Sequence, residues 1–237
     1  MMRKEPFTVG SYVHIVKRGA RGTSIVRDDI DRWRFVLMLR HFNDGYQPEN
    51  WFRSLIDEKL ANTLSRPKSW PAQKKTVEIL CYRLMDNHFH LLLKEITDGG
   101  VSKFMHRLGS SMSNHFNEKY KEKGSLFQGA YKSRTIDSDN YLRYVSAYIQ
   151  VKNSFELFPG GISGATKDFS SAYTLAAKDP YCSLGDYAGM RVSPVIGKDL
   201  LGEIFKTPKD YESFARDFIE GRNIEVPEEG QRSVFIE

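Results

Sequence analysis

The stretch DNHFHLLLK at residues 86–94 restricts the fold of this chain more than any other. Asp-Asn is typical of a turn, and the short apolar run after it is typical of a buried β-strand. Side chains alternate between the two faces of a strand, so His88 and His90 share one face while Phe89 and Leu91 share the other. We expect the Phe89 face to pack in a core and the two imidazoles to stand side by side on the opposite face.

Two interpretations of this histidine pair are open from the strand alone. Residues two positions apart in a strand lie about 6–7 Å apart, and two neutral imidazoles at that spacing can bind one divalent cation. The alternative is a half-buried strand on which two histidines occupy a polar face without any ligand. Other parts of the sequence have to decide between them.

The basic charge balance of the chain favours a polyanionic partner without requiring one. The formal net charge is +5 over 237 residues, and lysine and arginine are spread through the first 134 of them. Two cysteines are too few for a disulfide framework, and no apolar run approaches the ~20 residues that a membrane span needs. We therefore expect a cytoplasmic protein with reduced cysteines and no membrane partner.

The hydrophobic patterns predict strands mixed with helices. The expected strands are residues 11–16, 77–85, 88–95 and the end of the segment 125–136, and the expected helices are 28–42, 51–64, 101–120, 140–153, 197–205 and 208–220. The second and third strands form a hairpin across the Asp-Asn turn. This order predicts an α+β fold.

Residues 46–75 allow two interpretations. The segment contains three prolines, the aromatic residues Trp51 and Trp70, and several lysines and arginines. A basic, aromatic loop can stack on unpaired bases. The same composition fits an insertion held together by its own small hydrophobic cluster, and the sequence does not separate the two.

A row of phenols is the second informative feature. Tyr141, Tyr144 and Tyr148 fall at positions i, i+3 and i+7 of the helix expected at 140–153 and therefore share one face. The usual explanation is packing at the edge of a core. The alternative is that one phenol is a nucleophile, which with a pKa near ~10 needs activation at neutral pH. A metal that polarises a scissile phosphodiester supplies such chemistry.

With this combination of histidine pair and tyrosine row, the chain resembles the single-tyrosine HUH (IS200-like) transposases, and within them the REP-associated tyrosine transposases. His88-Phe89-His90 resembles the HUH motif, and the resemblance extends from about Tyr12 to Pro159. It is also carried by four other segments, 126–132, 139–142, 148–153 and 183–187. Each segment alone is a weak signal, but their order and spacing are specific and favour the metal interpretation.

The resemblance implies a ferredoxin-like HUH fold, with a central, mostly antiparallel sheet of four or five strands and helices packed on it. It implies a transposase domain over residues 1–158, followed at 159–237 by a C-terminal extension with short helices. Single-stranded, hairpin-bearing DNA is the implied substrate, and Mg²⁺ or Mn²⁺ the implied cofactor. Imidazole ligands suit Mn²⁺ better. A monomer and a homodimer are both compatible with the sequence.

The same resemblance assigns the site residues. Tyr148 is the expected nucleophile, with Tyr144 as its competitor one turn away, and His88 and His90 are the expected metal ligands. The resemblance also implies an Asn-Pro pair four and five residues past the nucleophile, where a polar residue can supply a third metal ligand.

This chain departs from the family pattern at that third position. It has Lys152 and Asn153 in place of the pair. A protonated lysine has no lone pair to offer. Asn153, water or the substrate is left to complete the site, and Lys152 is a candidate for holding a phosphate.

Three functions stay open from the sequence. The first is a DNA strand transferase, in which the tyrosine attacks a phosphodiester, holds the DNA as a 5′-phosphotyrosine and rejoins it. The second is a catalytically inactive, domesticated protein that binds single-stranded nucleic acid on the same scaffold. The third is a metal-dependent hydrolase without a tyrosine intermediate. Candidates for contacts with the DNA backbone are Arg18, Arg21, Lys132 and Arg134.

Overall fold

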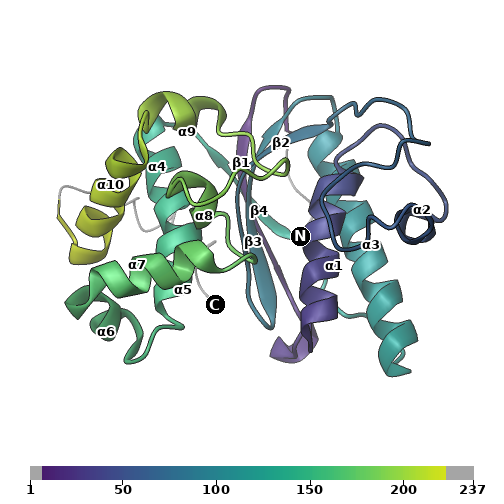
Figure 1. Cartoon of the computed structure of the whole chain (residues 1–237), viewed down its shortest axis with the longest axis horizontal. Helices are drawn as coiled ribbons and strands as arrows, with labels where there is room; N and C mark the ends of the chain where they lie inside the picture. The colour runs from purple at the N-terminus through teal and green to yellow at the C-terminus, as the bar shows by residue number, and fades with distance from the viewer. Residues whose placement is uncertain (1–6, 223–237) are drawn as a thin grey trace.

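A four-stranded antiparallel sheet divides the molecule, whose computed structural model describes residues 7–222. Its strands stand in the order β2-β3-β1-β4. They are β1 (Tyr12–Arg18), β2 (Val77–Leu84), β3 (His88–Glu95) and β4 (Lys132–Ile136). Figure 1 shows the sheet nearly edge-on between two layers of helices. The predicted α+β class with a central antiparallel sheet is confirmed.

The helices separate by sequence between the two faces of the sheet (Figure 1). The first layer comprises α1 (Asp29–Phe42), α2 (Trp51–Asp57) and α3 (Gly100–Tyr120). The second layer comprises α4 (Asp139–Ala147), the π-helical turn η2 (Tyr148–Lys152), α5 (Asn153–Phe155), α6 (Gly161–Lys167), α7 (Phe169–Lys178), α8 (Leu184–Tyr187), α9 (Asp199–Ile204) and α10 (Pro208–Glu220). A short 3-10 turn, η1 (Ala20–Gly22), follows β1. None of the helices within residues 7–222 is long and apolar enough to cross a membrane.

Most predicted elements lie within a few residues of the observed ones, and β3 and α10 match at both ends. Helix α2 is shorter than expected: it ends at Asp57 rather than near residue 64. The backbone enters the left-handed region at Lys59, with φ 58°, which stops a helix of L-residues. Helices α6, α7 and α8 were not predicted. For α7 a start signal is present, because the Asp168 side chain accepts a hydrogen bond from the Ser171 amide at 3.2 Å.

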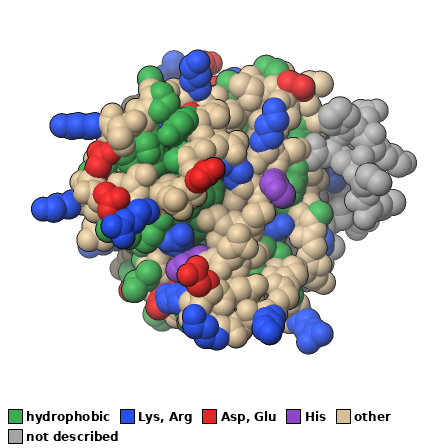
Figure 2. Space-filling view, turned by 90° about the vertical axis from the view of Figure 1, so that its right-hand side faces the viewer, with side chains coloured by type: hydrophobic (Ala, Val, Ile, Leu, Met, Phe, Trp, Pro, Cys, Tyr) green, Lys and Arg blue, Asp and Glu red, His purple; other side chains and the backbone are tan. Residues whose placement is uncertain are grey.

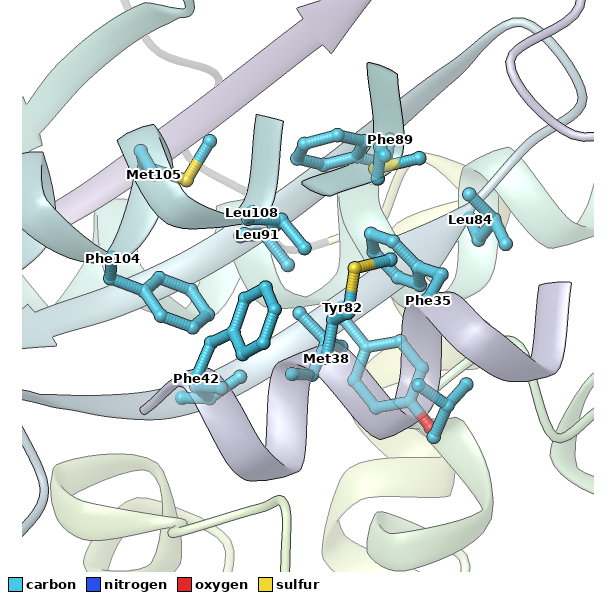
Figure 3. Close-up of a cluster of buried hydrophobic side chains, with 14 of the residues drawn as sticks. Phe35, Met38, Phe42, Tyr82, Leu84, Phe89, Leu91, Phe104, Met105 and Leu108 are labelled. Carbon is cyan, nitrogen blue, oxygen red and sulfur yellow. The ribbon is translucent and has the colours of Figure 1, made fainter. Parts of the chain in front are cut away.

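The first layer buries the face of β3 that the sequence assigned to a core. Phe89 and Leu91 are fully buried there, and Figure 3 shows them facing Phe35 of α1 and Leu108 of α3. Trp51 and Trp70 belong to the same hydrophobic cluster, and each is 8% exposed. The packing interpretation of residues 46–75 is therefore the one that the structure favours, since neither indole offers a free face for bases.

The opposite face of the sheet, which carries the histidine pair, is buried as well. Leu80, Cys81 and Leu92 form a second cluster with residues of the tyrosine helix, which is the continuous helix made of α4, η2 and α5. The same cluster takes in extension residues such as Phe169 and Tyr211. The extension thus shares a core with the preceding residues, and the boundary at residue 158 stays a prediction.

Candidate functional site

Three imidazoles meet on the second face of the sheet. In β3, His88 and His90 lie with their ring centroids 5.0 Å apart, as the alternation predicted. The third ring belongs to His14 of β1, which stacks on His90 at 5.3 Å with 15° between the planes. The Nε2 atom of His14 lies 3.0 Å from Nδ1 of His90. A hydrogen bond of this length requires that one of the two nitrogens carry the proton.

His14 was missed by the sequence analysis, although a signal for it exists. Val13 and Ile15 on either side are fully buried in the first core. Alternation therefore places His14 on the histidine face. What the sequence does not reveal is the strand order, which puts β1 next to β3 and brings Val16 opposite His90.

Burial keeps His14 and His90 neutral. His14 is 0% exposed and His90 is 2% exposed. Burial lowers the pKa of His14 to about 3, because a charged ring would lose its hydration. Burial also lowers the pKa of His90 well below its usual value, helped by the charges of neighbouring groups that include Lys152. Neutral imidazole is the form that binds metal ions.

Tyr148 faces this cluster from the helix above it. Its ring centroid lies 5.8 Å from that of His90 and 6.2 Å from that of His14. The residue opens a π-helical turn, in which the Asn153 amide donates to the Tyr148 carbonyl five residues back. Such turns insert one extra residue into a helix and are frequent at functional sites. The phenol is 4% exposed.

The other two tyrosines of the predicted row lie in different surroundings. Tyr144 packs against Phe218 of α10, with ring centroids 5.2 Å apart. Tyr141 is buried, and burial raises its pKa to about 12. The contacts with the imidazoles therefore favour Tyr148 over Tyr144 as the residue that works with the histidines.

Lys152 and Asn153 lie one turn beyond the tyrosine, as the sequence predicts, and have distinct environments. The ammonium of Lys152 lies 4.9 Å from the centroid of the Tyr148 ring and pairs with Glu156 at 2.6 Å. Asn153 is fully buried, and within residues 7–222 its side-chain oxygen and nitrogen have no hydrogen-bond partner. Burying an amide without hydrogen-bond partners destabilises a protein by about 1–3 kcal/mol, so we expect a ligand or a bound water at Asn153.

The donor set can be compared with the needs of a divalent cation. Within residues 7–222, no group of three or more His, Cys, Asp or Glu side chains is arranged to hold a metal ion. The buried Nε2 of His90 has no hydrogen-bond partner among those residues. By chemical type, the imidazoles of His88 and His90 and the amide oxygen of Asn153 are nitrogen and oxygen donors of the kind that an ion such as Mn²⁺ accepts.

The predicted segment 183–187 fastens the extension to the turn that follows the tyrosine. Gln150, fully buried in η2, donates to the Tyr211 hydroxyl and accepts from the Ser183 hydroxyl, each at 2.7 Å. The Ser183 oxygen also accepts from the Tyr82 amide of β2 at 2.9 Å. The Tyr187 hydroxyl donates to the Leu80 carbonyl at 3.0 Å. This segment therefore positions η2 against the sheet.

Three of the four candidate DNA-binding cations share the histidine face. In the ladders, Arg18 lies opposite His88, Arg134 opposite His14, and Lys132 opposite Val16. Directly paired residues project to the same side of a sheet.

The remaining candidate, Arg21, lies apart from the sheet. It is an exposed residue in η1 with a left-handed backbone, φ 55°. On the opposite side of the molecule, over α1 to α3, Figure 2 shows lysine and arginine standing apart among acidic and uncharged side chains. The histidine face is therefore where predicted cations and candidate site residues coincide.

The sequence around this site is similar to a known protein family. Residues 51–152 match the family model described as "Transposase IS200 like". This part of the chain is therefore similar to the IS200-like transposases. This region contains the histidine pair and Tyr148, and the predicted resemblance to IS200-like transposases is confirmed. No curated protein matches the chain.

One solved structure is also similar to this chain. It is described as "Structure of the REP associates tyrosine transposase bound to a REP hairpin". The two chains are 13% identical with a TM-score of 0.41, and the match covers 83% of this chain and 90% of that chain.

Proposed function

We propose that this chain is a metal-assisted tyrosine strand transferase that acts on single-stranded, hairpin-bearing DNA. The observation that carries the proposal is the position of the Tyr148 ring, 5.8 Å from the ring of His90. The proposed substrate class is also that of the REP-associated branch that the sequence resembles.

The proposed reaction conserves the energy of the phosphodiester. The phenolic oxygen of Tyr148 forms a bond to phosphorus while the bond from phosphorus to the 3′-oxygen breaks. The phenol loses a proton and the 3′-oxygen gains one. The DNA is left as a 5′-phosphotyrosine, and a 3′-hydroxyl can reverse the step without an external energy source.

The residues around the phenol have separate tasks in this scheme. His88 and His90 would hold Mg²⁺ or Mn²⁺, with Asn153 as the candidate third donor. When bound, the ion polarises the scissile phosphate and offsets its charge. Lys152, 4.9 Å from the centroid of the Tyr148 ring, stabilises negative charge that develops on the phenolic oxygen. Arg18, Lys132 and Arg134 would bind the DNA backbone on the same face of the sheet.

The test is a nicking assay with Mn²⁺ on single-stranded DNA taken from imperfect palindromes next to the coding region. Wild-type protein is expected to give a covalent protein–DNA band on a denaturing gel. Tyr148→Phe should remove the band while DNA binding, followed by fluorescence anisotropy, stays intact. Tyr144→Phe is the matched control and should keep the band.

Other outcomes point to the competing functions. A band that survives Tyr148→Phe and disappears in Tyr144→Phe moves the nucleophile by one turn. Cleaved DNA without any covalent band supports a metal-dependent hydrolase. Binding without cleavage in wild-type protein supports a domesticated nucleic-acid-binding protein. Lys152 favours this alternative, because a protonated lysine at the third-ligand position cannot bind a metal ion.

A further inference from the structure

A pocket of about 280 Å³ lies between the end of the tyrosine helix and α7. Arg83 of β2 lines it from the sheet, and Leu157 and Phe158 line it from the turn after α5. Leu175 and Lys178 close it from α7. The extension supplies five of the nine lining residues, and only Arg83 lies within the range that matches the family model.

Two of the residues that line the pocket are neighbours of candidate active-site residues. Arg83 lies directly opposite His90 in the β2–β3 ladder. Ser154, another lining residue, directly follows Asn153 and stands six residues after Tyr148. Six helical residues rise by roughly 9 Å. A DNA strand whose phosphate meets Tyr148 therefore passes the pocket within the reach of a neighbouring nucleotide.

The walls of the pocket are apolar and reach the surface. Leu157 is 61% exposed and Leu175 is 56% exposed. Phe158 adds an aromatic side chain to the lining. Two exposed leucines and a phenylalanine around one opening form the kind of surface on which an unpaired base packs, since every base has an apolar face.

The polar groups at the pocket suit a base with an attached phosphate. Arg83 is 3% exposed, pairs with Asp179, and has an Nε–H that lacks an acceptor within residues 7–222. Because the Asp179 carboxylate balances the charge of Arg83, the guanidinium would recognise a ligand mainly by a hydrogen bond and not by net charge. The exposed Lys178 supplies the net positive charge beside it. The volume is just below the usual range for small-molecule sites, which suits one nucleotide and excludes a duplex.

We propose that this pocket binds one unpaired nucleobase of the DNA strand on which Tyr148 acts. The apolar walls hold the base, Arg83 donates to one of its acceptor atoms, and Lys178 meets the adjoining phosphate. The site rests on the proposed strand-transferase function and adds to it a base-binding position next to the scissile bond.

The test combines a change in the pocket with removal of single bases from the DNA. Anisotropy measures the affinity of wild-type protein for the single-stranded substrate and for a series that carries one abasic site at each position. We expect one position at which loss of the base weakens binding by roughly 10-fold. Leu175→Asp, which puts a charge at the exposed rim, should weaken binding of the intact DNA by a similar factor.

The decisive result is that the two losses do not add. With Leu175→Asp, the abasic site at the sensitive position should cost nothing further, because the base has already lost its pocket. Ile30→Asp makes the same change at an exposed apolar residue of α1 and should behave as wild type. Lys178→Ala should weaken binding, whereas Lys167→Ala, at an exposed lysine of α6, should not.

Three results would contradict the proposed role of the pocket in binding a base. Fully additive losses would place the sensitive base elsewhere while the covalent adduct of Tyr148 still stands. A change of oligomeric state in Leu175→Asp, measured by light scattering, would make the surface a contact between protein chains. If wild-type protein binds no single-stranded DNA, both the proposed function and the proposed role of the pocket are wrong.

Discussion

His14 controls which nitrogen of His90 is available to a metal ion. If Nδ1 of His90 donates to Nε2 of His14, the Nε2 atom of His90 keeps its lone pair and can bind a cation. If the proton sits on His14 instead, His90 must carry its own proton on Nε2 and cannot bind. In the proposed metal site, binding at His90 would select the first tautomer, and His14 would act as a positioning residue for it.

This role predicts the behaviour of His14→Phe. The substitution keeps a ring of similar size in the buried site but removes the acceptor for His90. We expect the affinity for Mn²⁺ to fall by roughly 10–100-fold, the usual effect of losing such an outer partner. Isothermal titration calorimetry measures the affinity, and circular dichroism checks the fold.

The matched control is His106→Phe, an exposed histidine of α3 on the other side of the sheet. Its affinity for Mn²⁺ should equal that of wild type. Unchanged binding in His14→Phe would contradict the positioning role. Complete loss of binding in His14→Phe would make His14 itself a ligand.

How far the site could be predicted from the sequence depends on the range of the interactions that build it. His88 and His90 are two positions apart in one strand, so local alternation is enough to place them together. Tyr148 needs the spacing of a helix and a family resemblance. His14 needs the pairing of β1 with β3, which joins residues 76 positions apart and has no local signature.

At the scale of elements, the tyrosine helix is more than the amphipathic helix that its periodicity predicts. The π turn at Tyr148–Lys152 changes the register of everything after it. Periodicity cannot reveal this turn, because both halves of the helix keep an apolar stripe. The reason lies in distant partners: Gln150 is held by Tyr211 and Ser183, which come more than 30 residues later. The extension therefore sets the geometry behind Tyr148.

The contact between α1 and α3 stabilises the fold to a degree that depends on pH. Burial opposes ionisation of Asp31, but hydrogen bonds from Lys119 at 2.7 Å, from the Tyr120 hydroxyl at 2.6 Å and from the Arg27 amide at 2.9 Å prevail. Together they lower the pKa of Asp31 to about 2. Because its folded pKa lies below its unfolded value of about 3.9, the stabilisation is complete above about pH 4 and is lost as the pH falls through about 2.

Asp31→Asn should remove that stabilisation. We expect the free energy of unfolding at pH 7 to fall by about 2–3 kcal/mol, and the loss to shrink as the pH approaches 2. Urea unfolding at a series of pH values measures both effects. Asp29→Asn, two residues away with its side chain 87% exposed, should change the free energy by less than about 0.5 kcal/mol. Equal losses at pH 7 and pH 2 would contradict the ion-pair explanation.

The whole molecule consists of one sheet between two hydrophobic cores. The core toward α1 and α3 is built by residues that precede the tyrosine helix, apart from Val195. The core on the histidine face depends on the extension, which contributes Phe169, Tyr173, Tyr187 and Tyr211. The sequence suggested a transposase domain that ends at residue 158. In the structure, the candidate active site lies inside the core that the extension completes.

This arrangement also means that the site is closed. Tyr148 is 4% exposed and His90 is 2% exposed. A phosphodiester can reach them only if part of the second layer moves, as lids move in many enzymes. In the proposed reaction, the second layer, which includes the segment that positions Tyr148, would have to move before DNA could reach the phenol.

Removing residues 159–237 tests whether the extension is structural. The deletion would expose Leu80 and Leu92 of the sheet and one side of the tyrosine helix, and would leave Gln150 without either partner. Burial of a single large apolar side chain contributes about 1.5–3 kcal/mol, so the loss of several such contacts exceeds the stability of a typical domain. We expect the truncated chain to bind a hydrophobic dye and to lack a cooperative urea transition. A truncated chain with a cooperative transition and wild-type binding of Mn²⁺ would instead make residues 1–158 an independent domain, with the extension as a removable cover.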